Sequence, residues 1–206
     1  MEVNRYSEHT IDRAPIIMRM LDRLGTNFNS FDSVVELGSS TGKTITAISK
    51  VTENNCYGLD IVPNGEATDN LQFRKADLNE KMEKGFFDDF GKGLFFALDV
   101  IEHLENPFKI VKEFEEFAQG GSVLVLSCPN FASIRMLQAW VLGTLPKHEF
   151  GFFDKTHLHW LTPRNFREFD SLAFSSYIYS GKMGFKFVQS FLPSRMCSQF
   201  IVTFSK

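Results

Sequence analysis

The feature that most constrains the fold is a short apolar strand that runs directly into a glycine-rich turn and then into a helix. Residues 33–37 (SVVEL) are rich in β-branched side chains, and the segment GSSTG follows at residues 38–42. Residues 43–51 then have the composition of a helix. Glycines in such a turn let the backbone approach a ligand closely, and the helix N-terminus faces the same place. This arrangement is typical of α/β proteins that bind ligands at the ends of parallel strands.

The alternation of strands and helices continues along the chain. The run at residues 93–100 is almost continuously apolar, which is typical of a strand covered on both faces of a parallel sheet. We therefore expect an α/β fold with a doubly wound, mostly parallel sheet of seven strands, helices on both faces and an antiparallel last strand. The predicted strands are 33–37, 56–61, 71–75, 93–100, 122–127, 185–191 and 199–204, and the predicted helices are 11–24, 43–51, 107–118, 131–145 and 163–174.

Length and charge exclude several classes of protein. The 206 residues fit one domain, and the 22 basic and 25 acidic side chains give a net charge of -3 without a basic stripe. A large nucleic-acid footprint is therefore not expected. No apolar run reaches the roughly 18 residues of a membrane span, and the polar first residues do not resemble a signal peptide. We expect a cytoplasmic protein without an integral membrane segment, and the three scattered cysteines indicate neither disulfides nor a zinc site.

Three ligands compete for the glycine turn. The end of a nucleotide-binding P-loop, GK[ST], matches residues 42–44, but Leu37 stands where that motif requires its first glycine. The dinucleotide motif GxGxxG fails because Gly38 and Gly42 are separated by three residues. The third ligand is S-adenosylmethionine, which carries no phosphate and favours a carboxylate near its cationic groups.

Carboxylate side chains occur at or just after the ends of three predicted strands. Asp60 ends the second strand, 18 residues after Gly42, where it would accept hydrogen bonds from ribose hydroxyls. Asp77 follows the third strand and Asp99 follows the fourth. Because the carboxyl ends of parallel strands meet at one edge of the sheet, these side chains are expected at a common site.

From residue 34 to about residue 130 the sequence resembles class I S-adenosylmethionine-dependent methyltransferases. Residues 36–42 (ELGSSTG) resemble their acidic-x-Gly-x-Gly-x-Gly motif, with a serine at the middle glycine. Residues 99–107 (DVIEHLENP) are similar to the D-x-x-E-H-x-x-x-P segment of the ubiquinone O-methyltransferase-like branch, and so is the segment 156–166. Residues 128–131 (CPNF) with Leu145-Pro146 are similar to the methionine-biosynthesis protein W family, which is associated with the homoserine acyltransferase step.

The resemblance implies a Rossmann-like methyltransferase domain over residues 1–206. Residues 1–30 would form a helical cover, and residues 131–184 would form a variable substrate-side insertion. The implied cofactor is S-adenosyl-L-methionine, with S-adenosyl-L-homocysteine as the product. The cofactor-binding residues that the resemblance implies are Glu36, Gly38, Ser40, Gly42, Asp60, Ile61, Asp77, Leu78, Asp99 and Val100.

Histidines are the candidate catalytic residues. Methylation of a hydroxyl needs a base, and histidine titrates near neutrality. His103 follows Glu102 after the fourth strand, and His157 lies two residues before His159. A single Glu-His pair falls far short of a metal-ligand set, so no metal is expected.

We expect an enzyme that methylates an oxygen nucleophile of a small-molecule acceptor. The alternative is a cofactor-binding regulatory partner of a biosynthetic enzyme with little catalysis of its own. Residues 131–142 carry one charge, which suits a lid, a pocket wall, a contact in a homodimer or with a partner enzyme, or a buried core helix.

Overall fold

The structure, a computed structural model, describes residues 12–81, 86–144, 153–169, 175–179 and 199–206. It divides into two compact units, and each is described by itself. The first unit contains residues 1–97, 109–125 and 205–206, and the second contains residues 98–108 and 126–204. Among the described helices, none combines the length and the apolar character that a bilayer crossing requires.

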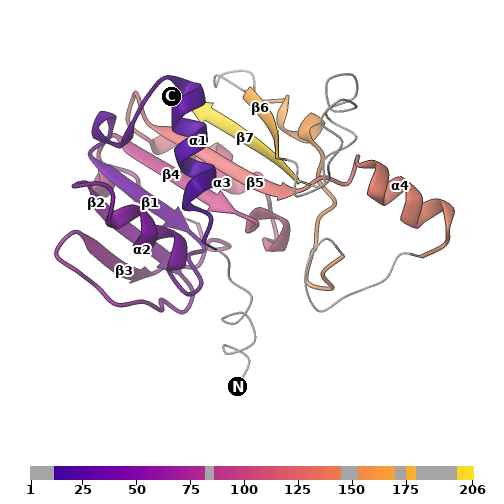
Figure 1. Ribbon diagram of the computed structural model, residues 1–206, viewed down its shortest axis with the longest axis horizontal. Coiled ribbons are helices and arrows are strands. Elements are labelled where there is room, and N and C mark those ends of the chain that lie inside the picture. Colours follow the sequence, from indigo (N-terminus) through magenta and orange to yellow (C-terminus); the bar gives the residue numbers. More distant parts are fainter. Residues whose placement is uncertain (1–11, 82–85, 145–152, 170–174, 180–198) are drawn as a thin grey trace. The chain divides into compact units, whose positions relative to one another are not determined.

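The first unit is built on parallel strands. β1 pairs in parallel with both β2 and β4, and β2 pairs in parallel with β3. Figure 1 shows α1 and α2 in front of these strands. The bounds are α1 Ala14–Leu24, β1 Ser33–Leu37, α2 Lys43–Ser49, β2 Asn55–Asp60, β3 Leu71–Lys75, β4 Gly93–Leu98 and α3 Lys109–Phe117.

The two faces of these strands differ in what covers them. Phe95 of β4 is buried and makes an edge contact with Phe114 of α3, at 6.0 Å between ring centroids. Glu36 of β1 points to the opposite face, where the Ile45 amide of α2 lies within hydrogen-bond distance. Because successive side chains of a strand alternate between faces, α2 and α3 cover opposite faces of the sheet. The strand end that carries the glycine turn therefore lies at the N-terminus of α2.

The order of the seven strands in the described part of the chain is β3-β2-β1-β4-β5-β7-β6. β6 pairs with β7 in antiparallel orientation, which confirms the predicted mostly parallel sheet with an antiparallel end. Further elements are the 3₁₀ helices η1 Phe28–Ser30, η2 Asp88–Phe90, η3 Ile101–His103 and η4 Pro163–Phe166, the helix α4 Ile134–Val141, and the strands β5 Val123–Pro129, β6 Ser175–Tyr179 and β7 Gln199–Ser205.

Two predictions for the C-terminal part differ from the structure. The helix predicted at 163–174 is wrong over its described part, which forms only the short turn η4. Thr162 and Asn165 form a capping box around that turn, and Phe166 is buried against Phe108 and Phe200. The sequence did not predict β6, and the strand predicted at 185–191 lies outside the described residues.

The helix predicted at 131–145 is observed as α4, which begins later than predicted. The Asn130 side chain accepts a hydrogen bond from the Ala132 amide, at 3.1 Å, and Ser133 caps the helix through the Met136 amide, at 3.4 Å. Side chains of asparagine and serine compete with helical hydrogen bonds in this way. α4 therefore begins at Ile134.

Candidate functional site

The glycine turn after β1 is tied to the end of β2 by backbone hydrogen bonds. The amides of Gly38 and Ser39 both donate to the Leu59 carbonyl, at 2.7 and 2.9 Å. Gly38, Ser40 and Gly42 have φ angles of 74°, 48° and 70°, in the left-handed region. Glycine reaches this region without the steric cost that a side chain brings, so the alternation of small residues follows from the backbone path. Ser40 adopts the same left-handed conformation although it carries a side chain, so the backbone is strained at this residue.

Asp60 closes this turn from the neighbouring strand. Its Oδ2 atom accepts a hydrogen bond from the Ser40 amide at 2.7 Å, and its Oδ1 atom accepts one from Val62 at 3.2 Å. Each carboxylate oxygen has a further lone pair, so Asp60 retains capacity to accept hydrogen bonds from ligand hydroxyls. Ile61 follows directly and is 51% exposed. The structure thus brings the predicted residues Ser40, Asp60 and Ile61 together.

Two hydroxyl groups in the turn are suited to a polar ligand. Ser39 Oγ and Thr41 Oγ1 are buried, and the described residues supply neither atom with a hydrogen-bond partner. A buried hydroxyl without a partner costs free energy, which a bound polar ligand would recover. Neither residue occupies a glycine position of the motif, so the two were not among the predicted site residues.

Phe73 of β3 explains why two glycines are needed here. A Cβ atom on Gly42 would lie 2.5 Å from the Phe73 ring, and one on Gly58 would lie 2.6 Å from it. Both distances are far below van der Waals contact. The glycine turn and β2 can therefore pack on the Phe73 ring only at residues that have no side chain. No local motif marked Phe73, since a phenylalanine in a strand usually belongs to the core.

Glu36 of β1 connects the strand before the glycine turn to the helix after it, α2. Its Oε2 atom accepts a hydrogen bond from the Ile45 amide at 3.1 Å, and its side chain is buried. Burial raises the pKa of Glu36 to about 8, although the Ile45 amide and the charge of Arg13 favour the ionised form. The negative charge of Asp60 adds to the increase in pKa. A cationic ligand group nearby would favour the ionised form further.

The loop after β3 is held by its own turn and by α3. Asp77 Oδ1 accepts a hydrogen bond from the Asn79 amide at 2.9 Å. Lys109 Nζ donates to the Leu78 carbonyl, at 3.2 Å, and forms an ion pair with Glu113 at 3.1 Å. Asp77 remains partly exposed and Leu78 is buried. These contacts fix the place of both predicted residues in the first unit.

In the second unit, Asp99 is engaged by other parts of the chain. Its backbone has a φ of 55°, and its amide donates to the Ser127 carbonyl at 3.0 Å. Gln199 Nε2 donates to both carboxylate oxygens, at 3.1 and 2.8 Å, and the Ser127 hydroxyl donates to Oδ1 at 3.2 Å. Gln199 was not among the predicted site residues, because a glutamine at the start of a strand belongs to no motif. Val100, the next residue, is partly exposed.

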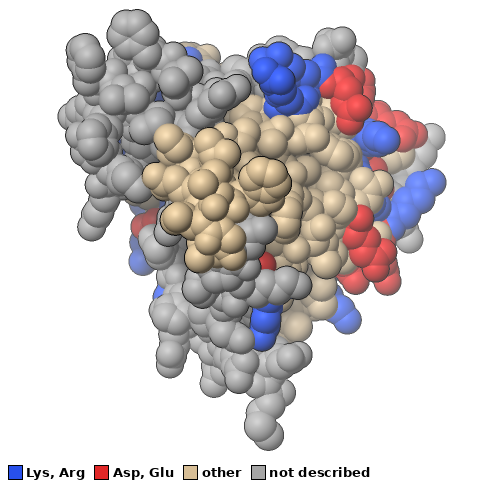
Figure 2. Space-filling model, turned by 90° about the vertical axis from the view of Figure 1, so that its right-hand side faces the viewer, with Lys and Arg blue, Asp and Glu red and all other residues tan. Residues whose placement is uncertain are grey.

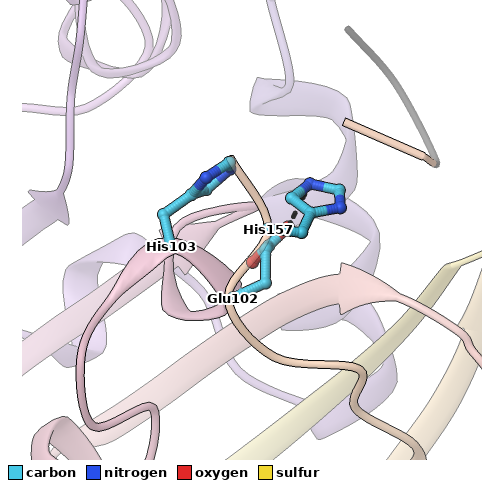
Figure 3. Close-up of side chains that lie close together, drawn as sticks. All are labelled: Glu102, His103 and His157. Atoms are coloured by element: carbon cyan, nitrogen blue, oxygen red, sulfur yellow. Dashed lines mark ion pairs between the residues drawn. The ribbon is translucent and has the colours of Figure 1, made fainter. Parts of the chain in front are cut away.

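Three titratable side chains of the second unit form a cluster, which we call the Glu102 cluster: Glu102, His103 and His157. One potential ligand atom from each lies within 4.8 Å of the others. Figure 3 shows Glu102 and His103 on η3, and His157 on the segment that passes beside it. The Glu102 carboxylate lies 3.9 Å from His157 Nε2, and its side chain is only 1% exposed. The structure thus joins both predicted catalytic histidines to one buried acidic group.

The orientation of His103 follows from its hydrogen bonds. Nδ1 lies 3.3 Å from the Thr156 carbonyl oxygen and 3.0 Å from Thr156 Oγ1. Oγ1 also lies 2.6 Å from Asp154 Oδ1, to which it donates its proton. The carbonyl oxygen can only accept, so we assign the ring proton to Nδ1. The lone pair of the neutral ring is then on Nε2.

The pair of histidines at 157 and 159 does not act as one unit. His159 Nε2 lies 3.1 Å from the Glu105 carbonyl oxygen and is outside the Glu102 cluster. The amides of Leu158 and His159 both donate to the Glu102 carbonyl, at 2.9 and 3.3 Å. These backbone hydrogen bonds hold the segment against η3 and bring only His157 to the Glu102 carboxylate.

Cys128 at the end of β5 is poorly suited to act as a nucleophile. It is fully buried, and burial raises the pKa of its thiol well above the ordinary value, with the charges of Glu102 and Asp99 adding to the increase. The reactive thiolate is therefore disfavoured at neutral pH.

α4 exposes apolar side chains. Trp140, Val141 and Leu142 are each at least 70% exposed. Figure 2 shows mostly uncharged described residues on the face turned to the viewer. The interpretation of residues 131–142 as an ordinary core helix is therefore wrong for the outer face of α4. Such a face is typical of a binding surface.

Comparison with known proteins identifies the class. Residues 8–168 match the family described as methyltransferase domain, which is most of the 206-residue chain. The chain belongs to this family, and it is an S-adenosylmethionine-dependent methyltransferase. No curated protein matches its sequence.

Solved structures share the fold at low sequence identity. The small RNA methyltransferase HEN1 is 16% identical with a TM-score of 0.62 over 94% of this chain, and the chain spans 25% of that protein. An S-adenosylmethionine-dependent methyltransferase from Mesorhizobium loti is 13% identical, with a TM-score of 0.58 over 93% of this chain and 96% of its own. Coclaurine N-methyltransferase, bound to N-methylheliamine and S-adenosylhomocysteine, is 11% identical, with a TM-score of 0.58 over 93% of this chain and 72% of its own.

Proposed function

We propose that this methyltransferase acts on an oxygen nucleophile of a small-molecule acceptor and belongs to the ubiquinone O-methyltransferase-like branch. The observation that carries the proposal is the Glu102 cluster directly after β4, because a hydroxyl acceptor must lose a proton during methylation. The net charge of -3 without a basic stripe favours a small acceptor over RNA. A cytoplasmic location is part of the same proposal.

The glycine turn fits the cofactor. When bound, S-adenosylmethionine supplies a methyl group that is activated by its sulfonium sulfur. The buried hydroxyls of Ser39 and Thr41 would donate hydrogen bonds to its polar groups, and Asp60 would accept hydrogen bonds from its ribose. Glu36 would favour its cationic end, with Gly38, Ser40 and Gly42 shaping the backbone. The remaining proposed contacts come from Ile61, Asp77, Leu78, Asp99 and Val100.

The Glu102 cluster would activate the acceptor. The lone pair on His103 Nε2, or the His157 ring, accepts the proton of the acceptor hydroxyl. The carboxylate of Glu102, 3.9 Å from His157, stabilises the positive charge that then develops on the imidazole. A positioned base of this kind contributes about 10²–10⁴-fold to the rate.

The first test is titration of S-adenosylhomocysteine into the protein by calorimetry, with Asp60→Ala alongside. We expect micromolar binding that the substitution strongly weakens. Formation of S-adenosylhomocysteine is then measured against hydroxyl, amine and RNA acceptors. Turnover with a hydroxyl compound supports the proposal, whereas turnover only with an amine or RNA overturns it.

A second candidate is a cofactor-binding regulatory partner of a biosynthetic enzyme, as in the methionine-biosynthesis protein W family. The exposed apolar side chains of α4 favour it, since they suit contact with another protein or a second copy. Cofactor turnover in cell extract separates the two candidates. Tight S-adenosylhomocysteine binding without any methyl transfer would favour the regulatory partner.

A further inference from the structure

We propose that Glu102, His103 and His157 form a binding site for a first-row divalent transition-metal ion. The sequence suggested only a Glu-His pair, and the structure adds His157 from a segment more than 50 residues away. The inference deepens the proposed function, because it concerns how the same cluster activates an acceptor oxygen. Its test is nevertheless a direct measurement of metal binding.

The three donors are close enough to share one ion. One ligand atom from each lies within 4.8 Å of the others. Metal–nitrogen and metal–oxygen bonds of about 2.0–2.2 Å place the ligands of one ion roughly 3–4 Å apart. Small rotations of the three side chains would therefore close the site. Figure 3 shows that the carboxylate and the imidazoles come from η3 and the neighbouring segment.

The surroundings of His103 are those of a metal ligand. Ligating histidines almost always donate their second ring N–H to a carbonyl or carboxylate, which fixes the tautomer and the direction of the ring. His103 Nδ1 has this contact with the Thr156 carbonyl oxygen, and Thr156 is in turn bonded to Asp154. The lone pair on Nε2 is consequently available as the ligating atom. This support is independent of the distances within the cluster.

The backbone holds the two ligand-bearing segments together before any ion binds. The Glu102 carbonyl accepts hydrogen bonds from the amides on the C-terminal side of His157, those of Leu158 and His159. The side chains of Glu102 and His157 are both nearly inaccessible, at 1% and 6% exposed. A metal cation stabilises a buried carboxylate more than an exposed one, because less water is present to screen the attraction between the two charges.

The donor set determines which cations are expected. Two imidazoles and one carboxylate suit ions from manganese to zinc, whereas magnesium and calcium prefer oxygen ligands alone. Three protein ligands also leave coordination positions open. An acceptor hydroxyl at such a position would have a lower pKa and could lose its proton to solvent, so the ion would replace histidine as the activating group.

The experiment uses chelator-treated, tag-free protein without cofactor or acceptor. Cobalt(II), zinc(II) and magnesium(II) are titrated by calorimetry, and the visible absorption of bound cobalt reports nitrogen coordination. We expect one ion per chain and affinities for cobalt and zinc at least tenfold above that for magnesium. His157→Ala and Glu102→Gln should each weaken cobalt binding at least tenfold, while His159→Ala should leave it within twofold.

Two results would overturn the inference: equal cobalt binding by His157→Ala and the unsubstituted chain, or no cobalt binding below millimolar concentration. Circular dichroism checks folding, and His103→Ala serves if Glu102→Gln does not fold. The proposed function fails separately, by absence of hydroxyl methylation. Methylation that persists in chelator and still needs His157 would support the histidine base and exclude the ion from catalysis.

Discussion

The glycine turn of the first unit and the Glu102 cluster of the second unit are built in different ways. The turn consists of consecutive residues whose backbone amides bond to Leu59 and Asp60. The cluster consists of side chains from segments more than 50 residues apart, joined by side-chain contacts. Backbone recognition leaves a pattern in the local sequence, whereas an assembled cluster does not. The difference suggests that cofactor binding and acceptor activation can be disrupted separately.

The largest expected effect concerns the cluster. His157→Ala removes a proposed base or ligand, and we expect kcat to fall about 10²–10⁴-fold. The affinity for S-adenosylhomocysteine should stay within twofold, because His157 does not belong to the glycine turn. Initial rates and calorimetry measure the two quantities. His159→Ala is the matched control, and equal rates for both variants would remove His157 from the mechanism.

The next effect concerns the turn. Asp60→Ala removes a carboxylate that bonds to the Ser40 amide and is proposed to hold the ribose. Hydrogen bonds to a charged group contribute about 1.5–3 kcal/mol, so we expect the affinity for S-adenosylhomocysteine to fall about 10–100-fold. Calorimetry measures it, with Asp69→Ala at an exposed position as control. An unchanged affinity would show that the cofactor lies elsewhere.

The third effect is the pH dependence of stability that Glu36 causes, and it is small at each step of one pH unit. The folded-state pKa of Glu36 is about 8 against 4.5 for the ordinary group, so the folded chain keeps a proton that the unfolded chain has lost. The stability from this protonated form is complete below pH 4.5 and is lost as the pH rises to 8, by about 1 kcal/mol per pH unit. Glu36→Gln should remove this slope. Urea unfolding at several pH values measures it, and an unchanged slope would contradict the assignment.

The smallest effect concerns the strained residue of the turn. Ser40 has a φ of 48°, which glycine adopts at lower cost, so Ser40→Gly should raise the free energy of unfolding by up to about 1 kcal/mol. Urea unfolding at constant pH measures the change. Ser30→Gly is the control, because that residue has a negative φ and should lose stability through chain entropy. A loss of stability in Ser40→Gly would show that the serine side chain is needed.

Prediction from sequence succeeded where local pattern and structure coincide. The strands at residues 33–37 and 71–75 were predicted with their observed bounds, and Asp60 was placed correctly beside the glycine turn. The helix predicted at 163–174 was wrong over its described part, because the chain forms only a short capped turn there and Phe166 packs on a remote ring. Gln199 and Phe73 carried no local signal, since their roles depend on what the fold brings beside them.

The sequence by itself determined the alternation of strands and helices, the glycine turn and the family, because these depend on backbone conformation and on spacing over a few residues. Only the tertiary structure decided that His157 joins Glu102 while His159, two residues later, contacts a backbone carbonyl. The physical reason is that side chains two residues apart share a face only in a regular strand, and residues 157–160 form no strand in the structure. Which of them meets a distant carboxylate depends on how the segments pack.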